Sequence, residues 1–161
     1  AGEIGHTRIT DDGRACRCGS SGCLETVASQ RAVLARARRE AESGTDWALA
    51  GEVVDHGSLL AAFRDGDPVA QAIVLESASP LGRIVGARIG TLGARDIVLV
   101  GPMADYGEPW LEQVRAEAER SALPQLVARS TIHLGRTGDD VVELGAAAML
   151  ITSELGLVLA A

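Results

Sequence analysis

The three cysteines of the chain all fall within eight residues, at Cys16, Cys18 and Cys23. An odd, clustered set of this kind argues against a disulfide framework. The spacing C-x-C-x4-C is typical of metal ligands carried by one loop, and a closed tetrahedral zinc site needs a fourth ligand. His6 is the nearest nitrogen donor and completes the pattern H-x9-C-x-C-x4-C. We therefore expect a Cys3His zinc site.

Two carboxylates, Asp11 and Asp12, are alternative fourth ligands, but zinc beside three thiolates usually prefers nitrogen. Gly19 and Gly22 would permit a tight backbone path around an ion. The competing interpretation is that the cysteines are only small buried hydrophobic side chains. If zinc binds, residues 6–23 form a zinc knuckle, and the metal is structural because four protein ligands leave no position for a reacting water.

Composition excludes several classes of function. The net charge is −7 and every basic residue is arginine, so lysine-dependent catalysis and a Walker phosphate loop are ruled out. The acidic balance makes the chain by itself a poor nucleic-acid binder. Neither an export signal nor an apolar segment long enough to span a membrane is recognisable, and we expect a cytoplasmic protein. The length of 161 residues suits one domain over residues 1–161.

Hydrophobic periodicity predicts strands that alternate with helices, which indicates an α/β fold. Ligands of such folds bind beyond the carboxyl ends of strands, here Gly101-Pro102 and the loop at 135–138. Gly82, Gly86 and Gly90 predict close packing of one helix, on a sheet or, alternatively, against a second copy. The expected strands are 3–9, 96–100 (buried and parallel) and 129–134, and the expected helices are 23–43, 58–65, 67–92 (kinked at Pro80), 108–122 and 142–155.

Two segments, Gly2-Glu3-Ile4-Gly5-His6 and Cys16-Arg17-Cys18-Gly19-Ser20-Ser21-Gly22-Cys23-Leu24-Glu25, resemble the signature of the ROK family. That family groups bacterial sugar-responsive repressors with sugar kinases. The resemblance implies one lobe of the actin-like, hexokinase-like (ribonuclease H-like) ATPase fold. It also extends, more weakly, to the later strand and turn and to the helix at Gly145-Ala146-Ala147.

The resemblance implies roles for particular residues. Glu3, His6 and Glu25 fall on the family's sugar-binding positions, and His6 is also a zinc ligand together with the three cysteines. Carboxylates accept hydrogen bonds from sugar hydroxyls, and one histidine nitrogen on zinc fixes the other as a donor. A glutamate in the first turn of a helix also simply compensates the helix dipole. Gly101 falls on the nucleotide side as a weak cofactor-binding candidate.

Departures from the family pattern narrow the expected function. The family's phosphate loop and catalytic aspartate precede the Gly-Glu motif, so we expect a carboxyl-terminal lobe that is not an enzyme alone. The amino-terminal lobe and any DNA-binding domain are expected outside this chain. Val100-Gly101-Pro102 replaces a paired glycine of the kinases and favours the regulators. We expect a sugar-sensing effector lobe of a transcriptional regulator that is homo-oligomeric; the alternative is the lobe of a glucokinase-like ATP-dependent kinase.

Overall fold

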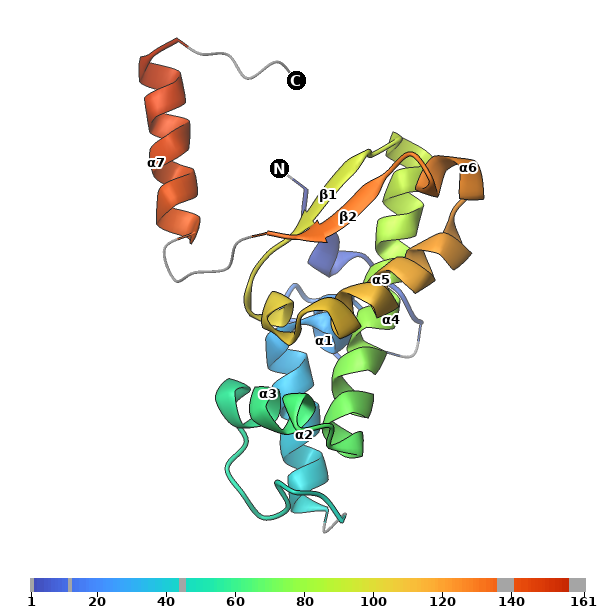
Figure 1. Ribbon diagram of the computed structural model, residues 1–161, viewed down its shortest axis with the longest axis vertical. Helices are drawn as coiled ribbons and strands as arrows, with labels where there is room; N and C mark the ends of the chain where they lie inside the picture. The colour runs from blue at the N-terminus through green and yellow to red at the C-terminus, as the bar shows by residue number, and fades with distance from the viewer. Residues whose placement is uncertain (1, 12, 44–45, 136–140, 157–161) are drawn as a thin grey trace.

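The computed structural model describes residues 2–11, 13–43, 46–135 and 141–156 (Figure 1). The fold is α/β, as the sequence predicts, with a small parallel sheet and a larger helical part. In chain order the elements are η1 (Ile4–His6), α1 (Glu25–Ala28), α2 (Gln30–Glu42), α3 (His56–Arg64), α4 (Pro68–Leu92), β1 (Asp96–Leu99), η2 (Pro102–Tyr106), α5 (Glu108–Ser121), α6 (Pro124–Val127), β2 (Thr131–Leu134) and α7 (Val141–Glu154).

Helix α4 is the scaffold of the molecule, and local sequence accounts for both of its ends. The Asp67 carboxylate accepts a hydrogen bond from the Ala70 backbone N–H at 2.8 Å, and Pro68 occupies the first helical position. Gly93 ends the helix with a φ of 62°, a backbone conformation that residues other than glycine rarely adopt. Pro80 lies inside the helix, as expected.

Strands β1 and β2 pair in parallel, with Ile97 opposite Ile132 and Leu99 opposite Leu134. These four side chains belong to the core or pack against it. The opposite face is open, and Val98 is 47% exposed. The predicted strand at 96–100 is therefore correct in place and direction, but it is only partly buried, and on one face.

Gly82 and Gly86 of α4 let another helix, α5, approach closely, so the close approach is confirmed but the preferred packing on a sheet is wrong. An added Cβ at Gly82 would lie 2.5 Å from the Val114 carbonyl oxygen of α5. At Gly86 it would lie 2.6 Å from the Ala118 carbonyl oxygen. Gly90 has no heavy atom within 4 Å of that position, so it takes no part in this packing.

The core lies where α4 meets α2, α3 and α5. All four aromatic residues (Trp47, Phe63, Tyr106 and Trp110) are buried in it. Trp110 anchors the first turn of α5, as its place in an amphipathic helix suggests. The remaining fully buried side chains are aliphatic, among them Leu59, Ile73, Ile89, Leu111, Val74 and Val114.

Two predicted elements differ from the structure. Residues 3–9 do not form a strand, because η1 takes up Ile4–His6 and leaves only an isolated bridge between Arg8 and Cys23. The predicted helix 23–43 is broken at Ser29, which is extended (φ −73°, ψ 152°). Its hydroxyl donates to the Glu25 carbonyl and also accepts from Ala32 N–H, so it starts α2 as a cap.

Helix α7 stands apart from the other elements (Figure 1). It carries exposed apolar side chains at Leu144, Met149, Leu150 and Ile151. None of the helices in the described part of the chain is both long and apolar enough to cross a membrane. The loop that was expected between β2 and α7 lies, beyond Gly135, outside the described residues.

The glycine contacts generate a matched pair of substitutions. Gly82→Ala should lower the free energy of unfolding by about 1–3 kcal/mol, because backbone on α5 must move to admit the methyl group. Gly90→Ala should leave it unchanged or raise it by up to about 1 kcal/mol, because alanine is the better helix former and the space is free. Urea unfolding of both variants measures the difference. Equal effects would contradict the close helix contact.

Candidate functional site

Four candidate metal ligands lie together in the structure. One ligand atom each from His6, Cys16, Cys18 and Cys23 falls within 4.8 Å of the other three. The His6 Nδ1 is 3.5 Å from the Cys16 Sγ, and the Cys18 Sγ is 3.7 Å from the Cys23 Sγ. All three cysteines are free thiols. The cluster could hold a metal ion.

Backbone hydrogen bonds close the loop that carries the cysteines. The Ile9 N–H donates to the Gly22 carbonyl at 2.8 Å, and the Leu24 N–H donates to the Thr7 carbonyl at 2.9 Å. Within the loop, the Cys16 N–H donates to the Ser20 carbonyl at 2.7 Å. These bonds bring the end of the loop back beside η1, and therefore beside His6.

Glycine is required at two positions of this loop. Gly22 has a φ of 69°, and a Cβ there would lie 1.9 Å from the Thr10 carbonyl oxygen. A Cβ at Gly13 would lie 2.2 Å from the Gly22 Cα. Gly19 also has a positive φ, of 89°, but in open space. The sequence pattern identified Gly19 and Gly22 but missed Gly13, because Gly13 is explained only by its contact with Gly22.

The thiols of the cluster have different environments. Burial raises the pKa of the Cys23 thiol to about 11, and Cys23 is fully buried. A backbone hydrogen bond from Ser20 lowers the pKa of the exposed Cys18 thiol. Because a metal binds the thiolate, an ion in the cluster would displace the Cys23 proton.

Asp11, an alternative fourth ligand, is not part of the cluster. Its carboxylate lies 3.5 Å from the Arg8 guanidinium and is exposed to solvent. Asp12, the other alternative, lies outside the described residues. The structure thus gathers His6 with the three cysteines, in the arrangement that the spacing predicts.

Two of the predicted sugar-binding residues lie close to the cluster. A Cβ on Gly5 would lie 3.2 Å from the Glu25 Oε2, so this carboxylate sits against the residue that precedes His6. Glu25 is partly buried in the first turn of α1 and, within the described residues, its carboxylate has no ion-pair partner. Glu3 precedes η1, and its carbonyl accepts the His6 N–H at 3.2 Å. The three residues thus come from two segments, the start of η1 and the first turn of α1.

The turn after β1 is built around Gly101. Its φ of 98° and ψ of −178° favour glycine on backbone grounds alone. Pro102 begins η2 and offers no N–H to a ligand. Gly101 therefore lies at the carboxyl end of a strand, as expected. Its backbone conformation alone accounts for the presence of glycine there, so a cofactor is not needed to explain it.

An anchor that the sequence analysis did not identify fixes η2 to α3. The His56 Nε2 lies 2.9 Å from an Asp105 carboxylate oxygen, and the His56 ring packs edge-on against Tyr106. Burial, and then the charge of Asp105, raises the pKa of Tyr106. No local signal marks this pair, because the two residues are 49 positions apart.

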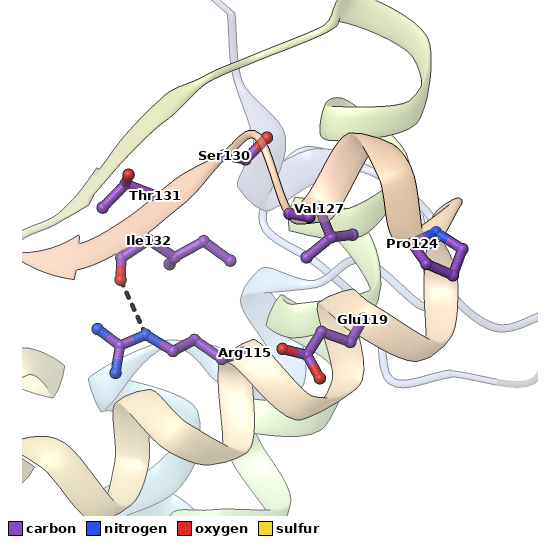
Figure 2. A pocket seen from close by; sticks show the side chains of 8 residues that line it. Arg115, Glu119, Pro124, Val127, Ser130, Thr131 and Ile132 are labelled. Atoms are coloured by element: carbon purple, nitrogen blue, oxygen red, sulfur yellow. Dashed lines mark hydrogen bonds between the residues drawn. The ribbon is translucent and has the colours of Figure 1, made fainter.

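A cavity of about 460 Å³ lies between α5, α6 and β2 (Figure 2). The Arg115 Nε donates to the Ile132 carbonyl at 2.9 Å, and the same guanidinium pairs with Glu108. Arg115 is therefore engaged in holding the outer edge of β2. The cavity also lies at the amino end of the strand, opposite the end at which α/β folds bind ligands.

Comparison with known proteins shows which family this chain resembles. The ROK family model matches residues 1–153. The chain is 29% identical over 159 residues to the xylose repressor of Caldicellulosiruptor bescii, with 96% of this chain and 40% of the repressor covered.

Two solved structures are similar in fold. One is a ROK family transcriptional regulator that is a homologue of the Escherichia coli Mlc protein; it has a TM-score of 0.82 and 27% identity, over 91% of this chain and 37% of that one. The other is a ROK family glucokinase from Streptomyces griseus in complex with glucose and AMPPNP. Its TM-score is 0.66 at 28% identity, over 92% of this chain and 51% of that one. The chain thus spans about half or less of each protein it resembles.

Proposed function

The chain belongs to the ROK family, and on this basis we propose that it is the carboxyl-terminal, sugar-sensing lobe of a ROK transcriptional regulator whose ligand site is braced by zinc. One observation carries the proposal: His6, a candidate ligand of both the sugar and the metal, lies beside the three cysteines and close to Glu25. A sugar kinase lobe is the alternative, because the similar proteins include a glucokinase.

The donor set and its spacing fit zinc. With Zn–S bonds of about 2.3 Å and Zn–N bonds near 2.0–2.1 Å, a tetrahedron separates two sulfurs by about 3.8 Å and sulfur from nitrogen by about 3.6 Å. One sulfur–sulfur pair here, Cys18 and Cys23, is 3.7 Å apart, and one sulfur–nitrogen pair, Cys16 and His6, is 3.5 Å apart. The four ligand atoms together lie within 4.8 Å of one another. His6, Cys16, Cys18 and Cys23 would hold the ion. When bound, the zinc would supply cross-linking of the loop and no reaction chemistry, since four protein ligands complete its shell.

The sugar role rests on neighbouring hydrogen-bonding groups. The Glu25 carboxylate is an acceptor without an ion-pair partner in the described residues, and it lies against Gly5 beside His6. Glu3 would add a second acceptor carboxylate. With one ring nitrogen on the metal, His6 would present its other nitrogen as a fixed donor. Acceptors and a donor held in fixed positions are suited to the hydroxyls of a sugar.

One observation favours a regulator over a kinase. Pro102 removes a backbone donor from the turn at which the kinases of the family approach the nucleotide. DNA contact would then belong to another part of the parent protein, in keeping with the net charge of −7 here.

A second lobe would explain the exposed apolar surface. Val98 and Val100 are 47% and 56% exposed on the open face of the sheet, and α7 exposes Met149 and Leu150. A two-stranded sheet is marginal alone, and apolar surface of this kind is normally covered. We propose that the amino-terminal lobe of the parent covers it. Alone, the chain would associate with itself, bind sugar weakly and catalyse nothing.

The zinc site predicts one tightly bound zinc per chain. Cys16→Ser and His6→Ala should each reduce zinc content well below one equivalent, because a structural site with three protein ligands is open to water and to competing chelators. His133→Ala is the matched control, because His133 pairs with Asp96 and is far from the cluster along the chain. This variant should retain one zinc per chain. Elemental analysis of metal-loaded, desalted protein measures this. Full zinc retention in His6→Ala would refute the Cys3His assignment.

The sugar site predicts a selective effect in the full-length parent. Glu25→Gln should weaken binding of the effector sugar about tenfold or more, since a charged acceptor is lost, while zinc content stays the same. Glu42→Gln, at the exposed end of α2, is the control. Calorimetric titration with glucose and with xylose provides the measurement. Unchanged affinity in Glu25→Gln for a sugar that the parent binds would remove Glu25 from the site.

The regulator proposal predicts binding without turnover. The full-length parent should bind a sugar, seen as a raised thermal midpoint, but form no sugar phosphate from Mg-ATP and that sugar. A ROK glucokinase assayed in parallel is the positive control. Catalytic turnover by the parent would establish the kinase alternative instead.

A further inference from the structure

A second cavity lies between the cysteine-bearing loop and three helices. Its volume is about 530 Å³, within the range of small-molecule sites. Glu3, His6 and Glu25 do not line it, so it is separate from the proposed sugar site. Its lining residues come from the loop before Cys16, from α1, from α2 and from α4.

The charged residues of this cavity are predominantly basic. Among the described residues, Arg14 of the loop, Arg36 of α2 and Arg83 of α4 line it, against one carboxylate, Glu76. Arg36 and Glu76 are paired at 2.6 Å. Arg14 and Arg83 have no ion-pair partner among the described residues. The described residues thus give this cavity a net positive charge, although the chain as a whole has a net charge of −7.

The uncharged lining residues show which hydrogen-bonding groups are free to contact a ligand. Thr26 donates its hydroxyl proton to the Cys23 carbonyl at 2.7 Å, and Ser77 donates its own to the Val74 carbonyl at 2.6 Å. Among the described residues, the side-chain donors left to a ligand are therefore the guanidinium groups and the Thr10 hydroxyl. The one lining carboxylate that the structure describes, Glu76, is already paired, so the cavity suits a group rich in acceptors rather than a cation. Aliphatic side chains complete the lining, at Ile9, Val27, Val33, Ile73 and Pro80.

We propose that this cavity binds a phosphate group, either as inorganic phosphate or as the phosphate of a small monoester. Guanidinium groups bind phosphate oxygens through paired, charge-assisted hydrogen bonds. Glu76 would hold Arg36 in place, and Arg14 and Arg83 would close on the anion from the loop and from α4. A cavity of this size favours a small molecule over an extended acidic peptide. The proposal depends on neither the zinc nor the sugar assignment.

Calorimetric titration of the full-length parent at low salt, with inorganic phosphate and with glycerol 3-phosphate, tests this site. Both ligands carry the same phosphate group, and tighter binding of the ester would identify a monoester as the natural form. Equal affinity would identify phosphate itself. Either should bind, and glycerol alone should not.

Variants locate the binding. Arg14→Gln and Arg83→Gln should each weaken phosphate binding about tenfold or more, and both residues are exposed, so folding should persist. Arg88→Gln, exposed on the same helix and outside the cavity, is the matched control and should bind as the unaltered protein does. Three results would overturn the proposal: no phosphate binding at millimolar concentration, binding of a polyglutamate peptide in its place, or equal losses in Arg83→Gln and Arg88→Gln.

Discussion

The candidate site depends on the closure of one loop. Residues 7–24 contribute few apolar side chains, so hydrophobic burial alone cannot hold them. Backbone bonds from Leu24 to Thr7 and from Ile9 to Gly22 bring the loop back on itself. The same closure gathers the His6 nitrogen with three thiols and sets the Glu25 carboxylate against Gly5. If zinc occupies that cluster, metal binding would also fix the positions of His6 and Glu25, and so the shape of the proposed sugar site.

Helix α4 and this loop face the same arginine-lined cavity. The helix packs against α1, α2, α3 and α5, and Gly82 and Gly86 allow α5 to approach closely. Through α5, the sheet is fixed as well, because Arg115 bonds the Ile132 carbonyl of β2. The arginine-lined cavity lies between α4 and the loop, so an anion there would contact both. The proposed sugar site and the proposed phosphate site would thus share the loop without sharing a residue.

Local chemistry in the sequence predicts much of this. Cysteine spacing indicated the four clustered ligands, and Asp67, Pro68 and Gly93 mark the ends of α4. Non-local contacts account for what was missed. Ser29 breaks a continuous helical pattern through its own hydroxyl. Residues that were expected in a strand form η1 instead, and only Arg8 pairs with a distant residue, Cys23. The partner of the α4 glycines, the pairing of His56 with Asp105 and the convergence of Arg14 and Arg83 all join residues far apart in the chain.

X-ray absorption spectroscopy at the zinc edge of the purified protein tests the central claim most directly. Our account predicts a four-coordinate shell of three sulfurs near 2.3 Å and one nitrogen near 2.0–2.1 Å. A shell dominated by oxygen, or one without a nitrogen scatterer, would contradict the assignment of His6, Cys16, Cys18 and Cys23 as the ligands that brace the site.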